Sequence, residues 1–335
     1  MNHKYLGCLL GAAIGDAMGA ATEMRTRQQI LDKFGFVDRI IEAPDDTFAR
    51  GCEVGCVTDD FSIAHDTVKI ILKNKGLINF SVAREALIYW GREDNYYLKF
   101  AGPTTKIAVR KLLGQTFPEP HGFKLCNDNS KSTNGAAMKM SPIALFSHGN
   151  VDKAIKDACI ISQVSHNNDI SISAACAIAA STAKALQTNV SLDDIIQAGL
   201  YGAEQGEKLG RIQGDTLAGP NVKRRIELAI ELARKEKPLT EIMDDISDLI
   251  GTGIAAAEAI PAVYGIIVAC KGNPMKSIIT VVNIGNDTDT IATMIGGILG
   301  AYHGSNAFDL SYLELINRVN HYNLEKMAYA IEDLK

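Results

Sequence analysis

The stretch GNDTDTIATMIGGILGAYHG, residues 285–304, joins a short run of acidic and hydroxyl side chains to a long apolar segment that contains several glycines. The apolar part predicts a buried helix. Four oxygen donors stand directly before it: Asp287, Thr288, Asp289 and Thr290. On a regular helix Asp287 and Asp289 point about 200° apart, so their side chains converge only where a loop enters the helix. The stretch therefore predicts a helix start at which several side-chain oxygens meet.

The negative charge of this junction has no neutralising partner nearby in the sequence, because residues 277–317 contain no Lys or Arg. One remedy is a hard divalent cation, which prefers oxygen ligands. The alternative is an Asp or Thr N-cap with acids at the positive end of the helix dipole, which is sufficient for any one of these residues. Taken alone, this junction leaves both interpretations open.

A second acidic junction lies in RGCEVGCVTDDFSIAHDTVKIIL, residues 50–72. Thr58 is a predicted N-cap, and Asp59 and Asp60 begin the helix that follows it. Residues 51–68 again contain no Lys or Arg. The two junctions together offer four carboxylates and at least two hydroxyls, a donor set that suits two magnesium or manganese ions about 3.5 to 4 Å apart.

The N-terminal residues 5–21 predict a tightly packed helix of Leu, Ala and Gly, in which Asp16 is the only charged residue. A lone acid there predicts either a hydrogen bond to a neighbouring helix end or an acceptor beside a metal pocket. Glu23 follows close to Arg25 and Arg27, a spacing that on its own is typical of a surface ion pair.

The composition favours a single all-α domain over residues 1–335. Hydrophobic residues make up 47% of the chain and aromatic residues only 6%, and the abundance of Ala, Ile and Leu favours close-packed helices. No linker or low-complexity run divides the chain. Residues 28–50 predict only one short extended piece, VDRIIEA.

Charge and cysteine content narrow the class of protein further. A net charge of -5 argues against general nucleic-acid binding. Seven cysteines, odd in number and scattered, predict a reduced, cytoplasmic protein, and Cys52 and Cys56 lack the second pair of ligands that a zinc site needs.

The most apolar segment, residues 254–270, contains Glu258 and Pro261, so no membrane span is expected. Without a long heptad or an apolar surface stripe, the chain is expected to be a monomer.

Five motifs in this order carry a family resemblance: GCLLGAAIGDAMGAATE, VTDDFSIA, NGAAMKMSP, SHNND and IGNDTDTIATMIGGILGAYHG. Together they resemble the ADP-ribosylglycohydrolase family, of the dinitrogenase reductase-activating glycohydrolase type. The resemblance implies an all-α orthogonal bundle of many helices with two magnesium or manganese ions. It also implies hydrolysis of the glycosidic bond between ADP-ribose and an acceptor, either a protein side chain or a small ADP-ribosyl compound.

The resemblance assigns roles to individual residues. It implies a metal-ligand set of Thr58, Asp59, Asp60, Asp287, Asp289 and Thr290. It implies catalytic roles for Asp60, Asp289 and Glu23, the last at a position that some members place on a mobile flap. It implies that the substrate-binding residues are Asn134, Gly135 and His166.

Three residues depart from the family pattern. Phe61 replaces the last residue of TDDT, Asn286 replaces the second glycine of GGD, and Lys139 stands where an arginine is common. None of them removes an implied ligand. Two other functions fit the same residues: a binuclear-metal hydrolase of a free nucleoside or nucleotide sugar, and a catalytically silent binding protein on the same fold.

Overall fold

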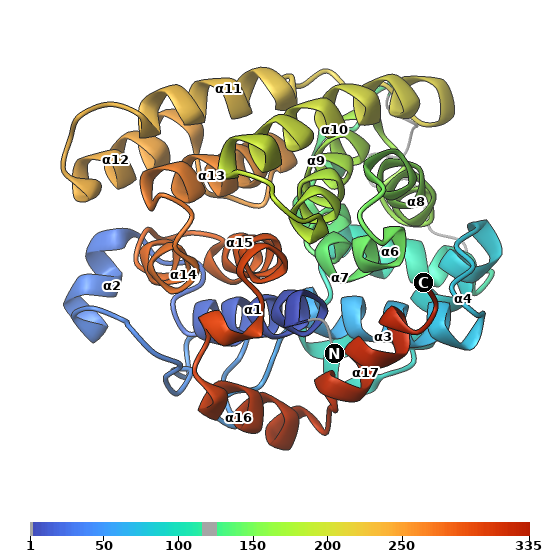
Figure 1. Cartoon of the computed structure of the whole chain (residues 1–335), viewed down its shortest axis with the longest axis horizontal. Helices are drawn as coiled ribbons and strands as arrows, with labels where there is room; N and C mark the ends of the chain where they lie inside the picture. Colours follow the sequence, from blue (N-terminus) through green and yellow to red (C-terminus); the bar gives the residue numbers. More distant parts are fainter. Residues whose placement is uncertain (1–2, 116–125) are drawn as a thin grey trace.

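The structure, a computed structural model, describes residues 3–115 and 126–335. Within this part of the chain there are seventeen α-helices, and the only β pairing consists of three isolated bridges (Figure 1). The all-α prediction is therefore confirmed. The helices are α1 (His3–Gly19), α2 (Arg27–Phe34), α3 (Asp59–Lys73), α4 (Phe80–Trp90), α5 (Asp94–Phe100), α6 (Pro103–Leu112), α7 (Met140–Ala144), α8 (Val151–Gln163), α9 (Asp169–Leu186), α10 (Leu192–Gln213), α11 (Val222–Ala233), α12 (Leu239–Asp245), α13 (Ala256–Ala269), α14 (Pro274–Val282), α15 (Thr288–His303), α16 (Leu310–Asn320) and α17 (Leu324–Glu332).

Helices α1 and α15 lie side by side at the centre of the fold, although they come from opposite ends of the chain (Figure 1). Small residues bring the two backbones together in antiparallel order, with Gly7 against Gly300, Gly11 against Gly296, Gly15 against Ala292 and Gly19 against Asp289. Side chains larger than hydrogen would separate the helices at these points. The contact thus places the end of α1 beside the start of α15.

Helix α9 forms a second buried axis of the molecule. The glycines of α10 pack against it, as where Gly202 meets the Cys176 carbonyl. Among the described helices, α9 is the one long and apolar enough to cross a membrane, and 94% of that span is buried inside the fold. Burial of this extent is typical of the core helix of a large domain.

The segment after α1 differs from the prediction. Helix α2 covers Arg27–Phe34, where the sequence predicts no helix, and residues 37–43 form no strand. The helix buries only Ile30, so its apolar period is too weak to stand out. A local signal does exist, because Thr26 and Gln29 form a capping box at its start.

Candidate active site

The start of α15 is fixed against the end of α1 by hydroxyl groups. The Thr288 Oγ1 donates to the Gly19 carbonyl at 2.9 Å and accepts from the Thr22 hydroxyl at 3.0 Å. Thr288 is therefore engaged in holding the two helices together, whereas Asp287, Asp289 and Thr290 remain on the side of the junction that lines a cavity.

Asp16 brings the second acidic junction to the same place. Its carboxylate accepts from the Thr58 amide at 2.9 Å and from the Phe61 amide at 2.8 Å, which caps the start of α3. Burial raises the pKa of Asp16 to about 7, and these hydrogen bonds act in the opposite direction. The resemblance did not assign Asp16 to the site, although its isolation in an apolar helix was a signal that the sequence contained.

Four buried carboxylates and the half-buried carboxylate of Glu23 form one cluster. Oxygens of Asp16, Asp60 and Asp289 lie within 4.8 Å of one another, and so do oxygens of Glu23, Asp287 and Asp289. The Thr58 hydroxyl donates to Asp60 Oδ2 at 3.1 Å, while Asp60 Oδ1 is buried and has no hydrogen-bond partner among the described residues. A buried carboxylate oxygen without a partner is costly unless something else binds it.

The electrostatics of the cluster favour a cation. The pKa of Glu23 is raised to about 8, mainly by burial and secondly by the charge of Asp287. Burial likewise raises the pKa of Asp59 to about 8, with the charge of Asp16 the next cause. The donors are all hard oxygens, which fits magnesium or manganese. The carboxylates close enough together to hold such an ion are those of Asp16, Asp60 and Asp289, and those of Glu23, Asp287 and Asp289.

The cluster forms one end of a cavity of about 450 Å³. Nine of the ten site residues expected from the sequence line it: Glu23, Asp59, Asp60, Asn134, Gly135, His166, Asp287, Asp289 and Thr290. The tenth, Thr58, is buried beneath them. Apolar side chains such as Phe48, Phe100 and Ile254 line the same cavity and provide surface for a planar ring.

Asn134 links the cavity wall to the carboxylates. Its Nδ2 donates to Asp287 Oδ2 at 2.5 Å, and its backbone amide donates to the Ile254 carbonyl at 2.9 Å. Asn134 therefore orients Asp287, a contact that the sequence did not predict.

Gly135 and His166 meet at the cavity surface. A Cβ at Gly135 would lie 3.0 Å from the His166 ring, so the glycine allows the close approach. The ring nitrogens lie 2.9 Å from the Thr133 hydroxyl and 2.8 Å from the Ser165 hydroxyl. Burial, and then the charge of Lys139, lowers the pKa of His166 to about 3, so the imidazole is neutral.

The sequence profile of the family described as ADP-ribosylglycohydrolase matches residues 1–335. The chain belongs to this family. Among relatives, the uncharacterized protein YegU of Escherichia coli (strain K12) is 28% identical over 333 residues, covering 98% of this chain and 96% of YegU. The ADP-ribosylhydrolase ARH3 of Homo sapiens is 26% identical over 328 residues, covering 90% and 85%. The ADP-ribosylarginine hydrolase Tri1 of Pseudomonas putida (strain GB-1) is 23% identical over 329 residues, covering 98% and 77%.

A solved structure shares the fold. A chain of an ADP-ribosylglycohydrolase-related protein complex superposes with a TM-score of 0.67 at 20% identity, covering 99% of this chain and 97% of that one. With hydrolases among its relatives, this member of the ADP-ribosylglycohydrolase family is a hydrolase.

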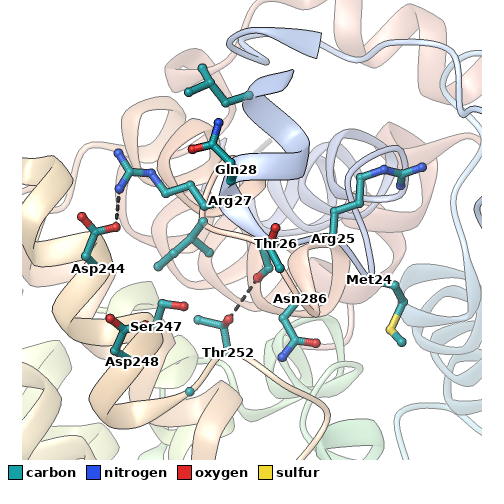
Figure 2. A pocket seen from close by; sticks show the side chains of 14 residues that line it. Met24, Arg25, Thr26, Arg27, Gln28, Asp244, Ser247, Asp248, Thr252 and Asn286 are labelled. Atoms are coloured by element: carbon teal, nitrogen blue, oxygen red, sulfur yellow. Dashed lines mark hydrogen bonds and ion pairs between the residues drawn. The ribbon is translucent and has the colours of Figure 1, made fainter. Parts of the chain in front are cut away.

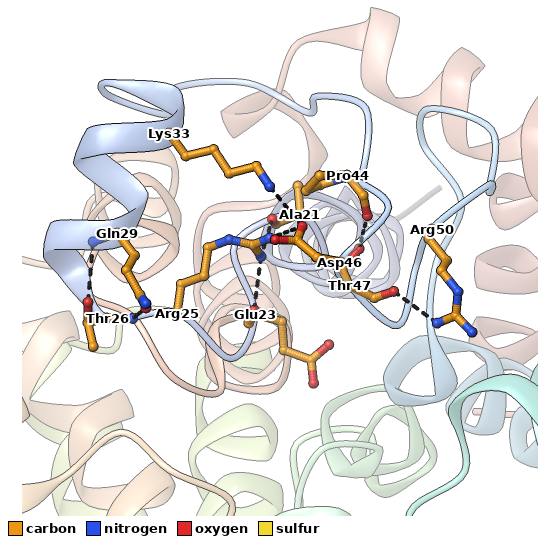
Figure 3. Close-up of polar contacts among 10 residues, drawn as sticks. All are labelled: Ala21, Glu23, Arg25, Thr26, Gln29, Lys33, Pro44, Asp46, Thr47 and Arg50. Atoms are coloured by element: carbon orange, nitrogen blue, oxygen red, sulfur yellow. Dashed lines mark hydrogen bonds and ion pairs between the residues drawn. The ribbon is translucent and has the colours of Figure 1, made fainter.

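The loop that carries Glu23 is held by Arg25. The Arg25 guanidinium donates to the Ala21 carbonyl at 3.2 Å and to the Glu23 carbonyl at 3.3 Å. Figure 3 shows these contacts. Arg25 also forms an ion pair with Asp46, which Lys33 contacts at 2.8 Å. These bonds leave the Glu23 carboxylate facing the cluster.

On its other edge the same loop pairs with the acidic junction of α15. The Met24 amide donates to the Asn286 carbonyl at 2.8 Å, and the Asn286 amide donates to the Arg25 carbonyl at 2.7 Å. Asn286 has a φ of +69°, a left-handed conformation that asparagine tolerates better than most residues. The change from glycine to asparagine in this family motif is therefore compatible with the backbone.

A larger cavity, of about 740 Å³, lies next to this pairing. Figure 2 shows Arg27 paired with Asp244 among the residues that line it. The Thr252 hydroxyl donates to the Gly285 carbonyl at 3.0 Å. No group of clustered carboxylates among the described residues lies in it. The smaller cavity is the candidate active site because it contains the carboxylates, whatever its volume.

The other two departures from the family pattern, Phe61 and Lys139, do not line the active-site cavity. The Phe61 ring is fully buried and lies 5.9 Å from the Tyr322 ring, between ring centroids. Lys139 is buried, with its ammonium 3.5 Å from the Ser165 hydroxyl, and burial lowers its pKa to about 8.

Proposed function

We propose that the chain hydrolyses the glycosidic bond between ADP-ribose and an acceptor, either a protein side chain or a small ADP-ribosyl compound, with the help of two magnesium or manganese ions. The observation that carries the proposal is the cluster of buried carboxylates, with the unpartnered Asp60 Oδ1, at the end of a cavity lined by Asn134, Gly135 and His166. The hydrolase names of ARH3 and Tri1 support the reaction class.

The ligand set of the proposal is Thr58, Asp59, Asp60, Asp287, Asp289 and Thr290. Bound ions would supply Lewis acidity toward ribose hydroxyls and would lower the pKa of a coordinated water. Asn134 keeps Asp287 in orientation through its hydrogen bond. Thr290 lines the cavity together with Asp60 and Asp287, which come from the two acidic junctions.

The remaining residues act on the substrate. Glu23 and Asp60 present carboxylates to the cavity from different segments, so that either can move a proton between water and the leaving group. Gly135 lets the substrate approach the backbone, and the neutral His166 offers a hydrogen bond without adding charge. Phe48 and Phe100 provide the apolar surface that an adenine ring needs.

The test is release of ADP-ribose from arginine-linked and serine-linked ADP-ribosyl peptides, with free nucleosides as the competing substrates. Release from one peptide in magnesium or manganese, loss of release in EDTA and loss in Asp289→Asn are the expected results. Asp289→Asn is compared with wild type by circular dichroism to verify folding. Undiminished release in EDTA, or cleavage of free nucleosides in place of both peptides, would overturn the proposal.

A further inference from the structure

Two thiols lie in a cavity that adjoins the active site. Cys52 and Cys56, in the loop before α3, line a cavity of about 530 Å³. This cavity shares Lys99 and Phe100, at the end of α5, with the active-site cavity. The Cys52 side chain is partly exposed, whereas four of the other cysteines are buried.

Lys99 holds Cys52 in a polar contact. The Lys99 Nζ lies 2.9 Å from the Cys52 Sγ and donates to the Arg50 carbonyl at 2.7 Å. An ammonium at this distance stabilises a thiolate, which is the nucleophilic form of cysteine. Its bond to the Arg50 carbonyl keeps the ammonium in place beside the sulfur.

A turn brings the second thiol to the first. The Cys56 amide donates to the Glu53 carbonyl at 2.9 Å, and Gly55 has a φ of +95°, as the third residue of a type II turn requires. The Cys56 thiol donates to the Val57 carbonyl at 3.3 Å, and both thiols line the same cavity. The neighbouring Cys56 thiol, and then the contact with Lys99, lowers the pKa of Cys52 to about 6, while burial acts in the opposite direction.

We propose that Cys52 is a reactive thiol that reduces hydroperoxides, and that Cys56 then converts the oxidised Cys52 into a Cys52–Cys56 disulfide. The Cys52 sulfur attacks one peroxide oxygen, so that an S–O bond forms, the O–O bond breaks and hydroxide leaves as water after taking a proton. The Cys56 sulfur then attacks the Cys52 sulfur, so that an S–S bond forms and the S–O bond breaks. The second hydroxide leaves as water with the Cys56 proton. Two thiols are oxidised by two electrons, and hydrogen peroxide is reduced to two waters.

The folded protein contains its own reference thiol, because Cys126 is exposed. Native protein in magnesium buffer at pH 7 is treated with hydrogen peroxide, alkylated and mapped by peptide mass. A peptide that contains both Cys52 and Cys56, unalkylated and lighter by about 2 Da than its reduced form, is expected before Cys126 reacts. Oxidation of Cys126 as fast as Cys52, or absence of this disulfide after Cys126 has reacted, would overturn the proposal.

Two variants separate the parts of the proposal. Lys99→Met is expected to slow Cys52 oxidation about tenfold and to leave Cys126 unchanged. Cys56→Ser is expected to stop the reaction at a Cys52 sulfenic acid, which dimedone captures. An unchanged Cys52 rate in Lys99→Met, or no dimedone adduct on Cys52 in peroxide-treated Cys56→Ser, contradicts the assignment. None of these measurements depends on glycohydrolase activity.

Discussion

Gly296 in α15 lies so close to Gly11 in α1 that a Cβ at Gly296 would come within 2.0 Å of the Gly11 carbonyl oxygen. This oxygen belongs to a helix backbone and cannot move without moving α1. We therefore expect Gly296→Ala to force the two helices apart and to lower the free energy of unfolding by about 3 kcal/mol, measured by chemical denaturation. The matched control is Gly102→Ala, where a Cβ meets open space and where a loss below about 1 kcal/mol is expected. Equal losses in the two variants would contradict the packing argument.

The second prediction concerns Arg25, which bonds to the loop carbonyls of Ala21 and Glu23. If the chain has the proposed activity, Arg25→Gln should lower kcat about tenfold with little change in KM, because Glu23 loses its fixed position while the rest of the cavity stays intact. Steady-state kinetics separate the two constants, and Arg25→Lys should recover only part of kcat, since lysine cannot reach two carbonyls and Asp46 together.

Lys33→Gln is the control for Arg25. Lys33 also contacts Asp46, at 2.8 Å, but makes no bond to the loop, so its removal should leave kcat near the wild-type value. If Arg25→Gln changes only the melting temperature, Arg25 stabilises the fold and does not position Glu23.

Local features of the fold were within reach of the sequence. Thr58 is the N-cap of α3, as predicted, and its side chain accepts from the Asp60 amide, because capping depends on residues only two or three positions apart. The all-α class followed from the composition, which is rich in Ala, Ile and Leu and poor in aromatic residues.

Contacts between distant segments were out of reach. Nothing in the separate sequences of α1 and α15 says that Gly11 meets Gly296, since small residues occur in many helices. For the same reason the local sequence predicted that Glu23 is a member of a surface ion pair with nearby arginines. In the fold its carboxylate lies close to that of Asp287. The family resemblance, whose five motifs run from Gly7 to Gly304, supplied the grouping of residues that local patterns could not.

The third prediction concerns Asn134, whose amide bonds to Asp287. Removing a partner that orients a metal-binding carboxylate lowers the metal affinity by about 10- to 100-fold. Asn134→Ala should therefore raise the Kd for magnesium or manganese by about tenfold or more, measured by calorimetry. Asn167→Ala, an exposed asparagine that does not line the cavity, is the control. Equal affinities in both variants would show that Asn134 does not orient a ligand.

The last prediction concerns acid stability. His166 has its pKa lowered to about 3 by burial and by Lys139, whereas the unfolded chain protonates histidine near 6.5. Between these pH values the unfolded state binds more protons than the folded state. The contribution of His166 to the free energy of unfolding is therefore fully present above pH 6.5 and decreases as the pH falls below it. From pH 6.5 to pH 5 the loss attributable to His166 should be about 2 kcal/mol.

Other groups titrate in this range, including His65, whose pKa is also lowered by burial. The quantity to measure is therefore the difference in slope between wild type and His166→Gln in denaturation at several pH values. A shallower fall in the variant is expected, because its side chain has no proton to gain on unfolding; parallel curves would mean that the folded protein binds a proton at His166 as readily as the unfolded chain does.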